Sequence, residues 1–143
     1  MRFVTQRLRV LILCTGNSAR SQMAEGLLRE LAAERMHVCS AGAKPSHVNP
    51  YAIEAMSERG IDIAGQSSDH LSKYLETEFD YVITVCDRAA ETCPVFPGKA
   101  ARVHWSIPDP AAVKGHHDAV LRSFITVRDD LERRLGEWLS ALG

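Results

Sequence analysis

Apolar residues along this chain occur either in short continuous runs or in longer stripes at helical spacing. The run VLIL at residues 10–13 shows no alternation, which is typical of a strand buried on both faces, here expected over Leu8–Cys14. A stripe at intervals of three and four positions follows and predicts a helix over residues 19–34. Residues 14–19 are therefore expected to form the loop that joins this strand to this helix.

The rest of the chain continues the alternation of strands and helices. Further apolar patterns predict strands at 37–40, 80–86 and 101–105, a loop with a short helix at 61–75, and helices at 50–59 and from about residue 117 onward. Strands that alternate with helices favour a parallel sheet covered on both faces. We expect one α/β domain over residues 1–143, a three-layer sandwich in which helices flank a four-stranded parallel sheet.

Composition and charge narrow the classes of function. A chain of 143 residues can bury a sizeable core without disulfides or a structural metal. The formal net charge of -1, with no long run of like charge, argues against a nucleic-acid partner. The first apolar run is too short for a signal peptide, and nothing approaches the roughly 20 apolar residues of a membrane span, so we expect a cytoplasmic protein without a membrane partner. In that reducing compartment the four cysteines are expected to be catalytic, metal-binding or simply buried thiols.

The loop after the first strand combines a thiol with donors for an anion. Cys14 ends the strand, and ligands bind at the carboxyl ends of parallel strands. Gly16 and Asn17 tolerate positive φ, so the loop can turn tightly and direct N–H groups toward an anion at the start of a helix. Arg20 would grip two oxygens of a tetrahedral oxyanion, and Ser21 is placed to hydrogen bond the sulfur of a Cys14 thiolate. The predicted oxyanion site consists of Thr15, Gly16, Asn17, Ser18, Ala19, Arg20 and Ser21.

The stretch CTGNSARS at residues 14–21 resembles the phosphate-binding loop of the low-molecular-weight protein tyrosine phosphatases, in which a cysteine is followed by five residues, an arginine and a serine. The resemblance extends through SAG at residues 40–42 and Asp109-Pro110, and so covers most of the chain. It implies a four-stranded parallel sheet flanked by helices, in agreement with the pattern of elements. It also favours a catalytic Cys14 over the alternative, a buried thiol beside a solvated Arg20.

A second thiol is expected at the same edge of the sheet. Cys86 ends the predicted strand 80–86, so it could come within disulfide range of Cys14 after a modest movement. Hydrolysis of a phosphate ester needs no second thiol. A reduction does, because the sulfur bound to the oxidised centre must be attacked by another sulfur to pass two electrons on. A helix between Cys86 and Cys93 would hold their Cα atoms about 10 Å apart, too far for a disulfide, so their joining would require that helix to unwind.

The order VCD, a short variable stretch and Cys-Pro at residues 85–94 resembles the thioredoxin-coupled arsenate reductases, which share the phosphatase fold. This resemblance implies that Cys14 attacks the arsenic atom of arsenate and that Cys86 then forms a disulfide with Cys14 as arsenite leaves. Cys93 would resolve that disulfide, and reduced thioredoxin would regenerate the thiols, in the service of arsenic detoxification. A low-molecular-weight thiol with a glutaredoxin-like partner stays open as the reductant, because a docking surface leaves no readable motif.

Asp109 follows the predicted fourth strand and so returns to the same edge of the sheet. By resemblance it is the general acid that protonates a departing oxygen; the alternative is an aspartate that only forms a turn before Pro110. Phosphate and arsenate are nearly isosteric, so phosphate and sulfate are expected to compete weakly for the pocket.

Some relatives hold a potassium ion with an Asn in the loop, a Glu on the first helix, a Ser ending the second strand and an Asp in the middle loop. Asn17, Glu25, Ser40 and Asp69 match this set in type and order. Oxygen ligands suit such a cation, although helix caps and surface polar residues would explain the same side chains. No tightly bound cofactor is expected. Cys39 lies in an apolar strand and is expected to be a core thiol, with a role as an extra redox partner left open.

Two other functions remain alternatives on the sequence. A phosphotyrosine or aryl phosphatase would use the same Cys14, Arg20 and Asp109, but phosphatases of this family often carry aromatic residues after the Asp-Pro, where this chain has AAV at residues 111–113. A noncatalytic redox or oxyanion sensor would form a disulfide that changes a partner surface, and sustained turnover would separate it from a reductase.

Overall fold

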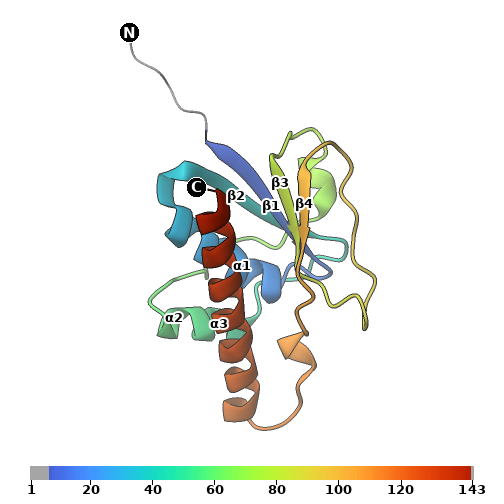
Figure 1. Ribbon diagram of the computed structural model, residues 1–143. Helices are drawn as coiled ribbons and strands as arrows, with labels where there is room; N and C mark the ends of the chain where they lie inside the picture. Colours follow the sequence, from blue (N-terminus) through green and yellow to red (C-terminus); the bar gives the residue numbers. More distant parts are fainter. Residues whose placement is uncertain (1–6, 143) are drawn as a thin grey trace.

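The chain alternates between strands and helices as the sequence pattern predicts. A computed structural model describes residues 7–142 (Figure 1). The strands are β1 (Leu8–Cys14), β2 (Met36–Gly42), β3 (Tyr81–Thr84) and β4 (Ala101–His104). The α-helices are α1 (Arg20–Ala32), α2 (Pro50–Glu58) and α3 (His117–Leu142). Three short 3-10 helices are η1 (Ala33–Arg35), η2 (Leu71–Tyr74) and η3 (Pro110–Ala112).

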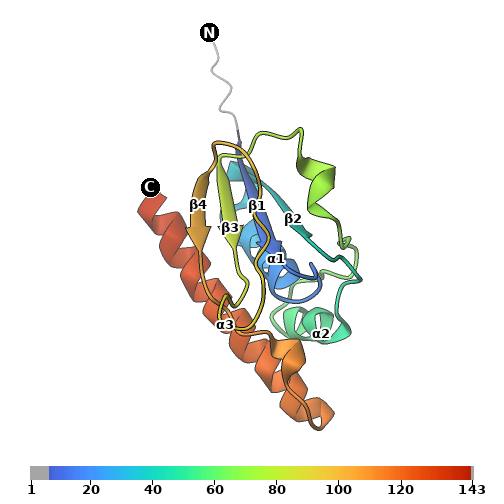
Figure 2. The same cartoon turned by 90° about the vertical axis from the view of Figure 1, so that its right-hand side faces the viewer.

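The four strands form one parallel sheet in the order β2-β1-β3-β4 (Figure 2). The chain passes from β1 through α1 to β2 on one side, and then crosses back to β3 on the other side of β1. The carboxyl edge between β1 and β3 is therefore the topological switch point, where open α/β sheets bind their ligands. The expectation of a four-stranded parallel sheet flanked by helices is confirmed.

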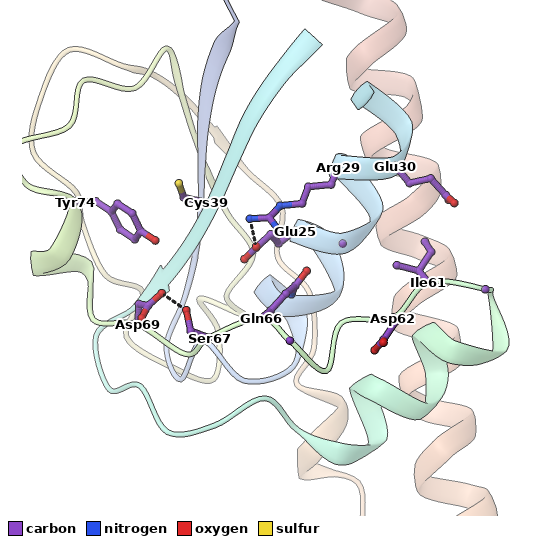
Figure 3. Close-up of a pocket in the computed structure, with 13 residues that line it drawn as sticks. Glu25, Arg29, Glu30, Cys39, Ile61, Asp62, Gln66, Ser67, Asp69 and Tyr74 are labelled. Carbon is purple, nitrogen blue, oxygen red and sulfur yellow. Dashed lines mark hydrogen bonds and ion pairs between the residues drawn. The ribbon is translucent and has the colours of Figure 1, made fainter. Parts of the chain in front are cut away.

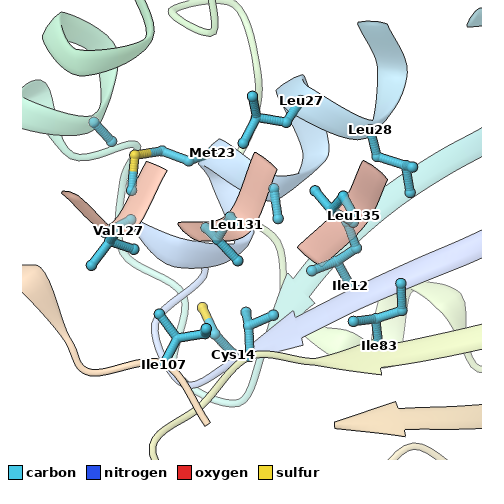
Figure 4. Packing of buried hydrophobic residues seen from close by; sticks show 14 of the residues in the cluster. Ile12, Cys14, Met23, Leu27, Leu28, Ile83, Ile107, Val127, Leu131 and Leu135 are labelled. Carbon is cyan, nitrogen blue, oxygen red and sulfur yellow. The ribbon is translucent and has the colours of Figure 1, made fainter. Parts of the chain in front are cut away.

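Helices and loops cover the two faces of the sheet unequally. One face packs against all three α-helices, in a core whose centre is shown in Figure 4. The other face carries Leu11 and Val82, which pack against Phe79, Phe96 and residues of η2. In Figure 1 the three α-helices lie toward the left of the sheet and η2, in light green, toward the right. All four residues of the run 10–13 are fully buried, as a strand covered on both faces requires.

Two elements end two residues earlier than the sequence pattern predicts. The predicted helix over residues 19–34 stops at Ala32, because Ala33 adopts a left-handed φ of 50° and the chain tightens into η1. The predicted strand over residues 80–86 stops at Thr84, because the chain leaves the sheet there for the connection to β4. Among the helices within residues 7–142, none is both long and apolar enough to cross a bilayer.

Candidate active site

Asn17 fixes the shape of the loop between β1 and α1. It has a positive φ of 45°, as predicted, and its side chain is fully buried. Its Oδ1 accepts from the Asp69 N–H at 2.7 Å, and its Nδ2 donates to the hydroxyl oxygens of Ser21 and Ser40 at 2.8 and 2.9 Å. Of the two residues that tolerate positive φ, Asn17 adopts it and Gly16 does not, and the side chain of Asn17 holds the turn in place.

The loop leaves backbone donors free at the start of α1. Across the described residues 7–142, none of the N–H groups of residues 15–19 donates a hydrogen bond, and α1 begins directly after them. A helix N-terminus carries unpaired donors and partial positive charge, so this arrangement suits an anion. Cys14 Sγ lies at the same place, buried at the end of β1 and 2.8 Å from the Ser21 hydroxyl oxygen (Figure 4). The loop thus brings the Cys14 sulfur together with an anion cradle, the free N–H groups of residues 15–19.

Arg20, the first residue of α1, places its guanidinium over this loop. The residue is only 4% exposed, and its Nη1 donates to the Ile107 carbonyl oxygen at 3.0 Å. Burial opposes the charge, but hydrogen bonds to Glu91 and the negative groups around it raise the pKa of Arg20 above its usual value. A fixed, fully charged guanidinium matches two oxygens of a tetrahedral oxyanion.

Asp109 faces Arg20 from the loop after β4. Its Oδ2 lies 4.0 Å from Arg20 Nη2, and its Oδ1 accepts from the Ala111 N–H at 3.0 Å. The two interpretations of this residue are therefore compatible. Asp109 caps η3, as a turn-forming aspartate does, and it also brings a carboxyl group to the Cys14 loop.

Glu91, which sequence reasoning missed, lies between Arg20 and the loop. Its Oε2 and Oε1 accept from Arg20 Nη1 and Nη2 at 2.5 and 2.9 Å, and Oε1 also accepts from the Thr15 hydroxyl at 2.6 Å. The Asp87 N–H donates to Oε2 at 3.1 Å. Burial disfavours the ionised carboxylate, but the hydrogen bonds from Arg20, Thr15 and Asp87 lower the pKa of Glu91 to about 2. The sequence offers only one sign of this role, an acidic residue between two cysteines. An acidic side chain exposed to solvent would give the same pattern.

Cys86 and Cys93 lie together beside Cys14. The Val85 N–H donates to the Leu13 carbonyl at 2.9 Å, which carries the pairing of β1 with β3 up to these cysteines. Cys86 is fully buried, whereas Cys93 is half-buried and packs against the same core. Burial and the nearby side chains of Cys93 and Cys14 raise the pKa of the Cys86 thiol well above its usual value.

The helix that the sequence allows between Cys86 and Cys93 does not form. Residues 88–90 form a turn, which is closed by the Glu91 N–H that donates to the Asp87 carbonyl at 2.9 Å. The Asp87 carboxylate also accepts a backbone N–H of this turn, a local bond by which aspartate competes with helix formation. No helix therefore has to unwind before Cys86 and Cys93 can join.

The four residues matched to a potassium site lie close together. The Ser40 hydroxyl donates to Glu25 Oε1 at 2.5 Å and accepts from Asn17, while Glu25 Oε2 pairs with Arg29 at 2.5 Å (Figure 3). The Asp69 carboxylate accepts from a neighbouring serine. Burial raises the pKa of Glu25. These are oxygen donors of the kind that hard cations prefer, whereas no three His, Cys, Asp or Glu side chains within residues 7–142 group as metal ligands.

Cys39 lies on the other face of the sheet from Cys14. It pairs with Leu11 in the β1–β2 register and packs in the second hydrophobic cluster, near η2. The thiol is half-buried (Figure 3), and burial raises its pKa, although the nearby Tyr74 side chain opposes that rise. The predicted core thiol is thus only partly buried, and the sheet separates it from Cys86.

Comparisons with known proteins agree with this geometry. The family model described as low molecular weight phosphotyrosine protein phosphatase matches residues 9–143. An arsenate reductase of Halalkalibacterium halodurans is 43% identical over 126 residues, which cover 88% of this chain and 91% of that protein. A solved structure of an arsenate reductase in the phosphate binding state has a TM-score of 0.78 at 33% identity and covers 95% of this chain and 99% of that one. The thioredoxin-dependent arsenate reductase of Corynebacterium glutamicum has a TM-score of 0.64 at 26% identity, over 93% of this chain and 64% of that one.

Proposed function

The chain belongs to the low-molecular-weight phosphotyrosine protein phosphatase family, and from that premise we propose that it reduces arsenate to arsenite with three thiols that thioredoxin regenerates. One observation carries the proposal. Cys86 shares a hydrophobic cluster with Cys14, and Cys93 packs against the same cluster, at the edge of the sheet that carries the anion cradle. A phosphatase uses the cradle, one thiol and an acid, but it has no use for two further thiols beside them. A reduction needs them, because electrons must pass from sulfur to sulfur.

The first half of the reaction takes place on Cys14. Its thiolate attacks the arsenic atom of an arsenate held by Arg20 and the loop N–H groups, and Asp109 protonates the oxygen that departs as water. Cys86 Sγ then attacks Cys14 Sγ. The sulfur–arsenic bond breaks, its electron pair stays on arsenic, and arsenite leaves. Two electrons have passed to arsenic, and the two cysteines are joined as a disulfide.

Cys93 completes the relay. Its thiolate attacks Cys86, which releases the Cys14 thiolate and leaves a Cys86–Cys93 disulfide. Cys93 is half-buried, and the nearby Val95 is 80% exposed, so this disulfide forms near the surface, where thioredoxin can attack it. Because all three thiols must be reduced again in every cycle, the proposal favours the cytoplasm as the compartment.

The test is NADPH consumption by the reduced protein with arsenate, thioredoxin and thioredoxin reductase. The wild type is expected to turn over many times. Cys93→Ser is expected to stop after about one arsenite per chain, because its Cys14–Cys86 disulfide cannot be passed on. Cys39→Ser is the matched control and is expected to keep the wild-type rate, since the sheet separates Cys39 from the relay. NADPH consumption no faster than in the arsenate-free reaction would overturn the thioredoxin-coupled function.

A phosphatase is the second candidate, because Cys14, Arg20 and Asp109 are sufficient for ester hydrolysis. The residues after Asp109 favour the reductase, since residues 111–113 are exposed Ala, Ala and Val rather than aromatic side chains that could line a phosphotyrosine slot. Hydrolysis of p-nitrophenyl phosphate with a kcat/KM equal to that for arsenate would favour the phosphatase. Phosphate is nearly isosteric with arsenate, so it is expected to bind the same pocket. Phosphate and sulfate are therefore expected to be weak competitors of arsenate.

The proposal includes a potassium ion held by oxygens of Asn17, Glu25, Ser40 and Asp69. The ion would supply positive charge beneath the loop and hold Asn17 in place, and Asn17 in turn positions Ser21. A higher Tm in potassium chloride than in choline chloride at equal ionic strength is expected. Glu25→Gln is expected to abolish that difference, and equal Tm values of the wild type in the two salts would overturn the site.

A further inference from the structure

The carboxylate of Glu91 lies where the proposed reaction needs an oxyanion, and no step of that reaction uses it. We propose that Glu91 is an internal competitor for the oxyanion pocket and a positioning residue for Cys93. An incoming oxyanion displaces the Glu91 carboxylate from Arg20. When this carboxylate leaves Arg20, the segment 87–93 that carries Cys93 is released. The role of Cys93 in this proposal rests on the proposed function, whereas the competition for Arg20 does not.

The competition follows from the contacts of Arg20. Both of its terminal nitrogens donate to Glu91, at 2.5 and 2.9 Å, and the Thr15 hydroxyl adds a third donor at 2.6 Å. A bidentate pair of this kind is among the strongest hydrogen-bonded contacts in proteins, and an oxyanion would use the same guanidinium fork. Because the Glu91 carboxylate uses both terminal nitrogens of Arg20, an oxyanion cannot take this bidentate position while Glu91 holds it. Glu91 and an oxyanion therefore exclude each other.

Glu91 also ties its segment to the rest of the chain. The bonds from Thr15 and Arg20 to Glu91 are the only hydrogen bonds by which a side chain of residues 87–93 reaches other parts of the described chain. The turn at residues 88–90 is exposed. A segment with so few buried contacts opens readily once its anchor leaves.

This anchoring couples the two halves of the relay. When an oxyanion displaces Glu91, the segment loosens, Cys93 withdraws from Cys86, and Cys86 is free to attack Cys14. When arsenite has left, Arg20 is vacant and Glu91 returns to it. The return brings Cys93 back to Cys86 at the stage where the Cys14–Cys86 disulfide must be resolved.

The first test is phosphate binding to the reduced, phosphate-free protein, measured by calorimetry. Glu91→Gln keeps the size of the side chain but removes its charge. It is expected to lower the Kd for phosphate about tenfold, because Arg20 is no longer occupied by a carboxylate in most molecules. Glu91→Asp restores the carboxylate and is expected to fall between the two. Glu78→Gln, an exposed glutamate before β3, is the matched control and is expected to bind phosphate like the wild type.

The second test is the rate at which brief pulses of iodoacetamide label Cys93, resolved by peptide mass spectrometry. In the wild type, saturating phosphate is expected to raise this rate several-fold, because displacement of Glu91 frees the segment. In Glu91→Gln the rate is expected to be high from the start and insensitive to phosphate. A phosphate Kd within twofold of the wild type, or a phosphate response of Cys93 that Glu91→Gln retains, overturns the proposal. Neither measurement uses arsenate, so failure of the proposal for Glu91 is distinguishable from failure of the proposed function.

Discussion

Gly42 of β2 lies so close to the Cys14 loop that a β-carbon built on it would be 2.6 Å from the carbonyl oxygen of Thr15. The same β-carbon would lie 2.9 Å from the Asn17 nitrogen and 2.9 Å from the Cys14 carbonyl oxygen. All three neighbours are backbone atoms, which cannot turn aside as a flexible side chain does. Gly42 thus permits the approach of β2 to the loop, which gives the SAG stretch at residues 40–42 a physical role.

Gly42→Ala is expected to deform the loop and weaken its grip on anions. The added methyl group must push the loop or β2 away, at a cost of about 1–3 kcal/mol in the free energy of unfolding. Phosphate affinity is expected to fall with it, because the N–H groups of residues 15–19 lose their arrangement. Urea denaturation and phosphate calorimetry measure the two effects.

Gly136→Ala is the matched control for that substitution. Gly136 lies within α3, and nothing approaches within 4 Å of a β-carbon built there. Alanine is the better helix former by about 1 kcal/mol, so this variant is expected to be slightly more stable than the wild type and to bind phosphate equally. Equal stabilities of Gly42→Ala and Gly136→Ala would contradict the contact at Gly42.

Ser21→Ala is expected to slow the first chemical step. The Ser21 oxygen lies 2.8 Å from both Asn17 Nδ2 and Cys14 Sγ. Because it accepts from the Asn17 amide, its own hydrogen is free to point at the sulfur, where it stabilises the thiolate. Loss of a hydrogen bond to a charged group is expected to lower the single-turnover rate of arsenite release about tenfold or more, measured by rapid quench. Ser57→Ala, on the exposed side of α2, is the control, and equal rates in the two variants would contradict the role of Ser21.

The parts of the site that are continuous in sequence could be predicted, and the parts that depend on distant contacts could not. Residues 14–21 run from a strand through a short loop into a helix, so the spacing alone brings Cys14, Arg20 and Ser21 together. The position of Cys86 followed from the parallel sheet, because neighbouring strands end at one edge.

The conformation of residues 87–93 depends on a pair of residues far apart in the sequence. Glu91 binds Arg20 across 71 positions, and no local pattern announces that bond. The stretch DRAAET at residues 87–92 can form a helix, with a propensity worth a few tenths of a kcal/mol per residue. The turn at Asp87 and the hydrogen bonds from Arg20 to Glu91 outweigh this propensity. The sequence therefore predicted the thiols but not the carboxylate of Glu91 beside the Cys14 loop.

Arg20→Lys is expected to lower the kcat/KM for arsenate roughly a hundredfold, although the charge is kept. A lysine ammonium cannot present two parallel donors, and it cannot reach both an oxyanion and the Ile107 carbonyl that now orients the guanidinium. Steady-state kinetics measure the effect. Arg133→Lys, an exposed arginine of α3, is the control and is expected to match the wild type. A kcat/KM for Arg20→Lys within threefold of the wild type would show that charge alone is sufficient.

The low pKa of Glu91 predicts a loss of stability in acid. Its pKa is about 2 in the folded protein against an ordinary value of 4.5, so the ionised carboxylate stabilises the fold above pH 4.5 and this contribution fades as the pH falls toward 2. Between pH 6 and pH 3 the wild type is expected to lose about 1–2 kcal/mol more of its free energy of unfolding than Glu91→Gln does, measured by urea denaturation. Glu78→Gln is expected to follow the wild type. Parallel pH profiles for the wild type and Glu91→Gln would mean that the carboxylate spends little time on Arg20, and would count against its role in the pocket.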